Sequence, residues 1–156
     1  MSTTYTYQDI TKDGVTNNYL VMKGLIDWPK ISQRVEKDNF GRLDKSVTFL
    51  FSSDKDAERA KKEGFPVLDK QFELNGKIYK AIEVYANKNT LCVKDENNNV
   101  IKDEEYFEDV ARGSEVKLLL RYGKRNNAPG KSWMRMVQLV LTNFVSKSDS
   151  TDTANF

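Results

Sequence analysis

Apolar residues recur at every second position along much of this chain, which is the period of a β-strand. In the segment 45–51, Val47, Phe49 and Phe51 alternate with polar residues and predict a strand. The segment 19–28 is apolar on both faces, which indicates a strand that is buried on two sides or that curls around a barrel. Further strands are predicted at 71–74, 77–86, 91–94, 115–122 and 133–145.

Turn and cap signals separate these strands. Asn75-Gly76 is a strong two-residue hairpin signal, and Asp13-Gly14 is another turn signal. A short, mostly charged helix is predicted to begin at Ser53 and to end at Gly64, and we expect it to lie on the surface as a connector. Residues 104–110 have the pattern of one further helical turn, and the polar segment 1–18 is expected to begin frayed.

Many short strands without a strand–helix–strand rhythm predict a mainly β protein. We expect an OB-like antiparallel β-barrel with five core strands and one or two short connector helices. The predicted domain covers residues 1–145. Residues 146–156 form a Ser/Thr/Asp-rich tail that is expected to be disordered.

Composition narrows the possible chemistry. The chain has 156 residues, no histidine and one cysteine, so it has no histidine base, no Cys-His nucleophile pair and no cysteine-cluster metal site. No apolar run reaches the roughly 18–20 residues that span a bilayer, and no secretory signal is visible. We therefore expect a cytoplasmic binding protein that is not an enzyme, contacts no membrane and needs no cofactor.

Charge is distributed unevenly along the chain. Residues 116–148 contain seven Lys or Arg and no Asp or Glu, whereas residues 95–109 contain seven acids and one Lys. In the basic segment, Tyr122, Trp133 and Phe144 stand among the cations. Cations bind phosphates, and rings stack on unpaired bases at about 1–3 kcal/mol per base, so the pattern predicts a single-stranded nucleic acid as ligand.

Strand alternation predicts which side chains share a face. Trp133, with Lys131 and Arg135 beside it, is the first stacking candidate, and a core position that closes the barrel is the alternative. Alternation places Trp133 and Arg135 on one face with Val137 and Leu139, and it places Lys117 and Arg121 opposite Tyr122. The residues predicted to bind the nucleic acid are Trp28, Lys30, Arg34, Phe40, Arg42, Tyr79, Lys80, Tyr85, Lys117, Arg121, Tyr122, Lys124, Arg125, Lys131, Trp133 and Arg135.

Several short motifs resemble the OB-fold single-stranded DNA-binding proteins of bacteriophages, both the T7-type and a related phage family. They are the turn 95–101, the strand start Gly113-Ser114-Glu115-Val116, Tyr122, Gly130, the run 137–140 and the segment GLIDWPKI at 24–31. The resemblance covers roughly residues 20–145. It implies a protein that coats and protects single-stranded DNA during phage replication and recombination, in the cytoplasm of a bacterial host.

In the T7-type proteins an acidic tail with a terminal aromatic residue docks on replication partners such as a polymerase or helicase. The matching residues here are Asp149, Asp152 and Phe156. This tail departs from the pattern, because it carries only two acids and Lys147 offsets one of them. A partner role for the tail and a plain disordered end are therefore both open.

Three other interpretations remain open from the sequence. The first is an RNA-binding barrel, since nothing in the pattern distinguishes the 2′-hydroxyl. The second is a protein-interaction module without nucleic-acid activity. The third is a metal-dependent nuclease that uses the acids between Asp103 and Asp109. The pattern also leaves a monomer and a dimer equally open.

Overall fold

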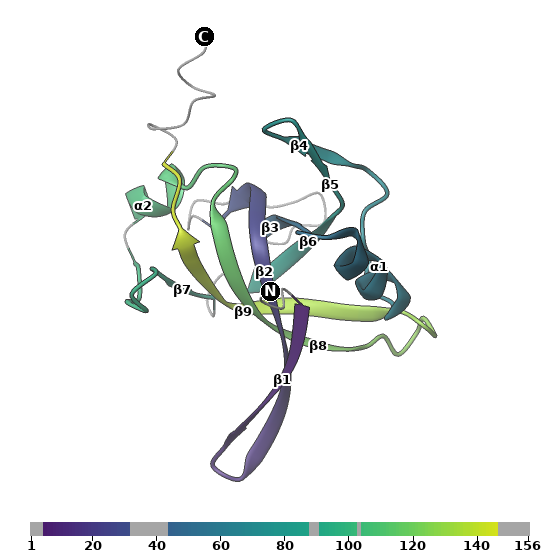
Figure 1. Cartoon of the computed structure of the whole chain (residues 1–156). Helices are drawn as coiled ribbons and strands as arrows, with labels where there is room; N and C mark the ends of the chain where they lie inside the picture. The colour runs from purple at the N-terminus through teal and green to yellow at the C-terminus, as the bar shows by residue number, and fades with distance from the viewer. Residues whose placement is uncertain (1–4, 32–43, 88–90, 103, 147–156) are drawn as a thin grey trace.

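The computed structural model describes residues 5–31, 44–87, 91–102 and 104–146. Within these residues the chain forms nine strands and two helices (Figure 1). The strands are β1 (Tyr5–Lys12), β2 (Val15–Lys30), β3 (Asp44–Leu50), β4 (Phe72–Leu74), β5 (Lys77–Tyr79), β6 (Ala81–Asn87), β7 (Cys92–Lys94), β8 (Glu115–Lys124) and β9 (Ser132–Asn143). The helices are α1 (Asp54–Lys62) and α2 (Glu104–Asp109).

Five of the strands close into a ring. β2 pairs with β3, β3 with β6, β9 with β8, and β8 with β2, all antiparallel. The ring closes between β6 and β9 through one parallel pair, Tyr85 with Arg135. This order confirms the predicted OB-like barrel with five core strands. β7 adds a short parallel strand along the edge of β9 that also pairs with β6.

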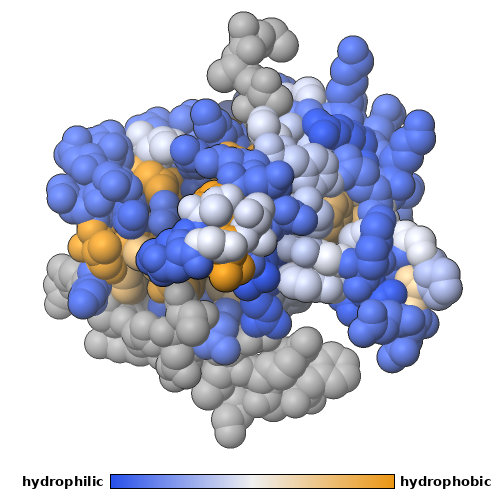
Figure 2. All heavy atoms as spheres, turned by 90° about the horizontal axis from the view of Figure 1, so that it is seen from below, coloured by the Kyte–Doolittle hydropathy of each residue, from blue (hydrophilic) through white to orange (hydrophobic). Residues whose placement is uncertain are grey.

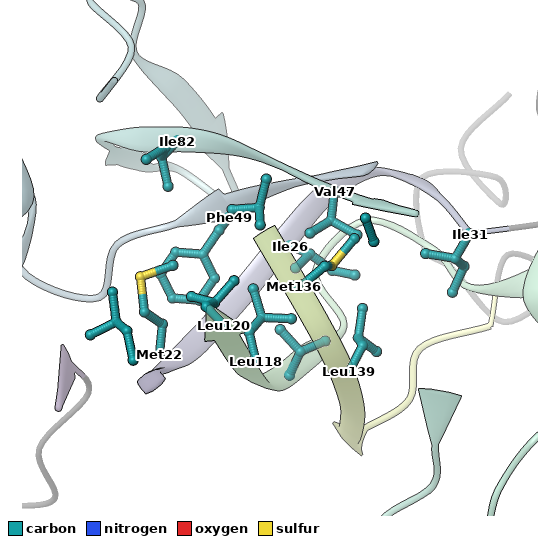
Figure 3. Close-up of a cluster of buried hydrophobic side chains, with 14 of the residues drawn as sticks. Met22, Ile26, Ile31, Val47, Phe49, Ile82, Leu118, Leu120, Met136 and Leu139 are labelled. Carbon is teal, nitrogen blue, oxygen red and sulfur yellow. The ribbon is translucent and has the colours of Figure 1, made fainter. Parts of the chain in front are cut away.

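Side chains from all five barrel strands fill the interior. Met22 and Ile26 from β2, Phe49 from β3, Leu118 from β8 and others are almost completely buried. In Figure 3 they point toward one another between the strands. Because successive side chains of a strand point to opposite sides, burial of this set leaves the alternate residues on the outer face of the barrel.

The polar segment before β2 contains a strand that the sequence did not predict. β1 pairs with β2 from Tyr5 to Lys12, and the two strands turn at Asp13-Gly14, where a turn was predicted. The start of the chain that was expected to be frayed lies outside the described residues. Figure 1 shows the β1–β2 hairpin extending beyond the barrel. The sequence did not predict β1 because its outer positions are polar. Tyr5, which is 1% exposed, supplies its main contact with the core.

The predicted helix and hairpin are confirmed, with one correction. The Ser53 hydroxyl caps α1 by accepting a bond from the N–H of Asp56, at 3.2 Å. The strand predicted at 77–86 is wrong as a single element, because the chain breaks at Lys80 into β5 and β6. The β4–β5 hairpin then covers the outer face of the barrel, where Leu74 packs on Leu50 in a second small core.

An ion pair fixes this hairpin to the barrel. Asp27 lies on β2 with its side chain almost fully buried, and the Arg112 guanidinium donates to its Oδ2 at 3.0 Å. The same guanidinium nitrogen donates to the carbonyl of Glu73 in β4, at 2.7 Å. Arg112 therefore ties the barrel wall to the covering hairpin through two charge-assisted hydrogen bonds.

Replacing Arg112 should lower the stability of the folded protein. We expect Arg112→Met to reduce the free energy of unfolding by about 1–3 kcal/mol, because the buried Asp27 carboxylate loses a charged donor. Chemical denaturation measures this change. Lys55→Met, at an exposed position of α1, should change it by less than about 0.5 kcal/mol. Equal losses in the two variants would contradict a specific role for the ion pair.

Candidate nucleic-acid interface

The basic residues of β8 and β9 lie on the outside of the barrel. Val116, Leu118 and Leu120 are buried, and the alternate residues Lys117 and Arg121 are exposed. Trp133 and Arg135 of β9 are also exposed, Trp133 by 36%. The core alternative for Trp133 is therefore wrong. The predicted separation of Lys117 and Arg121 from Tyr122 is confirmed.

The strand pairing places two tyrosines and two arginines in one row across the barrel. Three of the four were predicted site residues, and Tyr19 was not. Tyr19 on β2 pairs with Arg121 on β8, which pairs with Arg135 on β9, which pairs with Tyr85 on β6. Residues that pair directly across strands share a face, with their Cβ atoms about 4.5–5.5 Å apart. We call this set the tyrosine–arginine row. Two cations lie at its centre and a phenol ring lies at each end.

A second row of cations crosses the same face. Lys23 on β2 pairs directly with Lys117 on β8, and both side chains are exposed. Lys117 pairs on its other side with Val140, which pairs with Lys94 on β7. We call Lys23, Lys117 and Lys94 the lysine row. It lies four residues from the tyrosine–arginine row along β8, which is about 14 Å at 3.4 Å per residue.

Like charges that face each other directly across two strands destabilise a sheet. This face carries two such pairs, Lys23 with Lys117 and Arg121 with Arg135. Among the described residues, no carboxylate forms an ion pair with Lys117 or Arg121. Between Lys23 and Lys117 the arrangement is unfavourable for the isolated fold, and a bound polyanion would relieve it by neutralising these cations.

Trp133 lies next to the tyrosine–arginine row. It pairs with Gly123, and its indole ring lies across the backbone of β8 at this point. A Cβ atom placed on Gly123 would be 2.8 Å from the indole nitrogen. The absence of a side chain at residue 123 therefore lets the ring settle onto the strand while part of it stays exposed to solvent.

One prediction about β9 is wrong. Simple alternation placed Val137 and Leu139 on the face of Trp133 and Arg135, but Leu139 is completely buried. The cause is a β-bulge. Leu119 pairs with Gln138 and Leu120 pairs with Met136, so Val137 has no partner and the side chains after it change faces. Gln138 and Val140 occupy the outer face instead.

The end of α1 holds the base of the β8–β9 loop. The N–H of Ser132 donates to the carbonyl of Gly64 at 2.8 Å, and its hydroxyl donates to the carbonyl of Glu63 at 2.7 Å. Gly64 has a φ of +94°, and a Cβ atom there would overlap the carbonyl oxygen of Gly130. This close backbone approach positions the loop, whose exposed cations are Lys124, Arg125 and Lys131.

An aromatic cluster supports the same region from inside. The ring of Tyr122 lies 5.0 Å from that of Tyr7 and 6.4 Å from that of Phe65. Next to it, the Tyr5 hydroxyl donates to a Glu63 carboxylate oxygen at 3.2 Å. Burial, reinforced by the Glu63 charge, raises the pKa of Tyr5, and burial also raises the pKa of Glu63. Tyr122 thus contributes to packing in this structure and is directed away from the outer face.

The remaining predicted residues are distributed as follows. Tyr85 belongs to the tyrosine–arginine row. Tyr79 is half-buried in the β4–β5 hairpin, whereas Lys80 lines a separate pocket beside α1. Sequence reasoning missed Tyr19, Lys23 and Lys94, because only the pairing register brings them to the basic strands. The following predicted sites lie outside the described side chains: Trp28, Lys30, Arg34, Phe40, Arg42, Asp149, Asp152 and Phe156.

The surface seen from below in Figure 2 is mostly hydrophilic, with smaller hydrophobic areas between the polar groups. Over the described ranges, no three His, Cys, Asp or Glu side chains are grouped so that they could hold a metal ion. Asp103 lies outside these ranges, and the side chains of Glu104, Glu105 and Glu108 are not described. Asp109 accepts a hydrogen bond from the Ser146 hydroxyl. None of the helices described is long and apolar enough to cross a membrane.

Comparison with solved structures identifies the fold. The single-stranded DNA-binding protein from bacteriophage Enc34 matches with a TM-score of 0.61 at 11% identity, over 96% of this chain and 99% of that chain. Its complex with single-stranded DNA matches with the same score and identity, over 81% and 87%. The chain has the fold of a phage single-stranded DNA-binding protein. No family model and no curated protein matches the sequence.

The resemblance to the T7-type proteins is weaker at the level of structure. The single-stranded DNA-binding protein gp2.5 of bacteriophage T7 matches over 85% of this chain and 93% of its own, at 13% identity. Its TM-score is 0.38.

The close backbone approach between Gly64 and Gly130 leads to a prediction about the β8–β9 loop. We expect Gly64→Ala to lower the free energy of unfolding by at least about 1–3 kcal/mol, because alanine disfavours a positive φ and its methyl group displaces Gly130. Amide hydrogen exchange at Ser132 and Arg125 should become faster. The Ser132 amide donates to the carbonyl of Gly64, and the Arg125 amide donates to the carbonyl of Lys131 at the base of the loop.

Gly14→Ala is the matched control for this variant. Gly14 also has a positive φ, of +75°, but a Cβ atom there meets nothing within 4 Å. It should show the cost of the backbone conformation alone and leave exchange in the loop unchanged. If the amide of Ser132 exchanged at the same rate in both variants, the close approach of Gly64 to Gly130 would not be what positions the loop.

Proposed function

We propose that this protein binds single-stranded DNA without sequence preference across the outer face of β2, β8 and β9. The observation that carries the proposal is the pair of like-charged contacts, Lys23 with Lys117 and Arg121 with Arg135. The pair Lys23 and Lys117 costs stability in the free protein, and phosphates that bind the cations of both pairs offset the repulsion between like charges. Tyr19, Tyr85 and Trp133 lie beside the cations, where bases of the same strand can reach them.

Binding would follow from two physical terms. Lysine and arginine neutralise phosphates and release counterions, so affinity should fall steeply as salt concentration rises. The rings stack on the faces of bases, which all bases have, so sequence preference should be slight. A duplex hides those faces in its own stacks and offers only phosphates to this surface. We therefore expect a single strand to bind more tightly than the same sequence in a duplex.

The wider role is proposed on the same basis. A sequence-independent binder with this fold suits the coating and protection of single strands during phage DNA replication and recombination. The Enc34 protein, whose fold this chain shares, was solved in complex with single-stranded DNA. The tail residues Asp149, Asp152 and Phe156 are proposed to dock on replication proteins such as a polymerase or helicase. The mechanism requires no catalytic step.

A fluorescence-anisotropy titration tests the proposal. A labelled oligo-dT, its duplex with oligo-dA, and a matched RNA oligomer are titrated with the full chain at two salt concentrations. We expect salt-sensitive binding that favours the DNA single strand. Tighter binding of RNA would redirect the proposal to an RNA-binding barrel. Absence of binding at low salt would refute a nucleic-acid role and leave a protein-interaction domain.

The salt dependence of a charge variant tests the tyrosine–arginine row. Each phosphate contact of a single strand contributes about 0.7 to the slope of log affinity against log salt, so Arg121→Ala with Arg135→Ala should reduce the slope by about 1.4. Lys55→Ala with Lys102→Ala removes the same charge from residues outside β2, β8 and β9. An equal reduction in both double variants would indicate only a general charge effect.

Trp133 should contribute by stacking. We expect Trp133→Ala to weaken single-strand binding by about 1–3 kcal/mol, whereas Trp133→Phe keeps a ring and should lose less than half of that. The titration above measures both variants, and a thermal melt confirms that each is folded. If the folded alanine variant bound like the unmodified protein, Trp133 would not belong to the interface.

A further inference from the structure

A pocket lies between the barrel and the β4–β5 hairpin, at the far end of the basic face. It has a volume of about 370 Å³. β2 and β8 supply Lys23, Leu25 and Glu115, and the hairpin supplies Lys77 and Tyr79, while Gly24, Leu50 and Ser52 complete the lining. The two lysines are exposed, so the pocket opens at the surface.

The walls of this pocket combine apolar surface with positive charge. Leu25, Leu50 and Tyr79 belong to the second small core, and they form an apolar wall that includes the aromatic side chain of Tyr79. The Lys77 ammonium lies 5.1 Å from the centre of the Tyr79 ring. Glu115 is the carboxylate in the lining, and one of its oxygens accepts a hydrogen bond from the Thr142 hydroxyl at 3.0 Å.

The pocket is continuous with the proposed DNA-binding face. Lys23 belongs both to the pocket lining and to the lysine row, where it faces Lys117 across β2 and β8. Glu115 lies two residues before Lys117, about 7 Å further along β8. A single strand of DNA that crosses the tyrosine–arginine row and then the lysine row therefore arrives at the mouth of the pocket.

We propose that this pocket receives one unstacked base of the bound single strand, with its phosphate held by Lys23 and Lys77. The inference rests on the proposed function and extends it to a site that the basic strands alone do not reveal. A nucleobase combines a flat apolar face with an adjacent anionic phosphate, and this pocket offers the matching pair of surfaces. The base stacks on Tyr79, and the site lies at one end of the bound segment.

A length series of oligonucleotides tests the pocket. Labelled oligo-dT strands of increasing length are titrated with the full chain and with Lys77→Gln/Tyr79→Leu. Strands too short to span from Trp133 to the pocket should bind both proteins equally. Longer strands should bind the variant about 5- to 100-fold more weakly, because one stacked base and one phosphate contact are lost.

The same hairpin provides a matched control. Lys70 lies 5.3 Å from the ring centre of Phe72, and Phe72 pairs directly with Tyr79, but neither Lys70 nor Phe72 lines the pocket. Lys70→Gln/Phe72→Leu therefore removes an equivalent cation–ring contact from the same small core. It should bind strands of every length like the unmodified protein. If both double variants lost affinity equally, or neither did while the protein still bound DNA, the pocket proposal would be overturned.

Photo-crosslinking of the unmodified protein gives a test that needs no variant. 5-Iodouracil is placed at each position of a long strand in turn, and the crosslinked peptide is identified by mass spectrometry. A crosslink to Tyr79 from a base near one end of the strand supports the proposal. Crosslinks confined to Trp133, Tyr19 and Tyr85 would overturn it and leave the proposed function intact. Absence of any DNA binding would instead refute the proposed function itself.

Discussion

The barrel depends on β2 pairing with three different strands. Its first residues pair with β1, its middle pairs with β8, and its end pairs with β3. One strand can serve both β8 and β3 only if it curls around the barrel between them. Gly24 lies where the pairing with β8 gives way to the pairing with β3, and a Cβ atom there would lie 2.7 Å from the carbonyl oxygen of Leu50 and 2.9 Å from the ring of Phe49. A larger residue would push β3 away and open the barrel.

The same pairing determines the binding surface. Once Met22 and Ile26 of β2 face inward, Lys23 must face outward, and the register with β8 places it against Lys117. Shifting the register by one residue would move every one of these side chains to the other face, which the core does not permit. The fold therefore holds like charges together at a cost that hydrophobic burial offsets. This is the physical basis on which binding of a polyanion can stabilise the folded state.

The sequence predicted the core better than it predicted the surface. Alternation in 45–51 and the signals at Ser53, Gly64 and Asn75-Gly76 are local, so they could be recognised without partners. Alternation also placed Lys117 and Arg121 correctly. It failed at Leu139, because a bulge at Val137 depends on the partner strand. It could not find Tyr19 or Lys23, since their proposed role arises from pairing with Arg121 and Lys117, roughly 100 positions away in the sequence.

Basic and acidic residues are also segregated between the two ends of β9, and this affects how a single strand of DNA would approach the protein. The strand begins beside the basic β8–β9 loop and ends beside β7 and α2, which Figure 1 places on the opposite side of the barrel. In the acidic segment 95–109, Asp95 accepts hydrogen bonds from the N–H groups of Asn97 and Asn99, each at 2.9 Å, and so stabilises its own turn. A net charge of +2 therefore conceals a field that runs along the barrel. In the proposed complex with single-stranded DNA, this field would direct the polyanion toward the loop and Trp133 and away from α2, so that electrostatics would set the orientation before any base stacks.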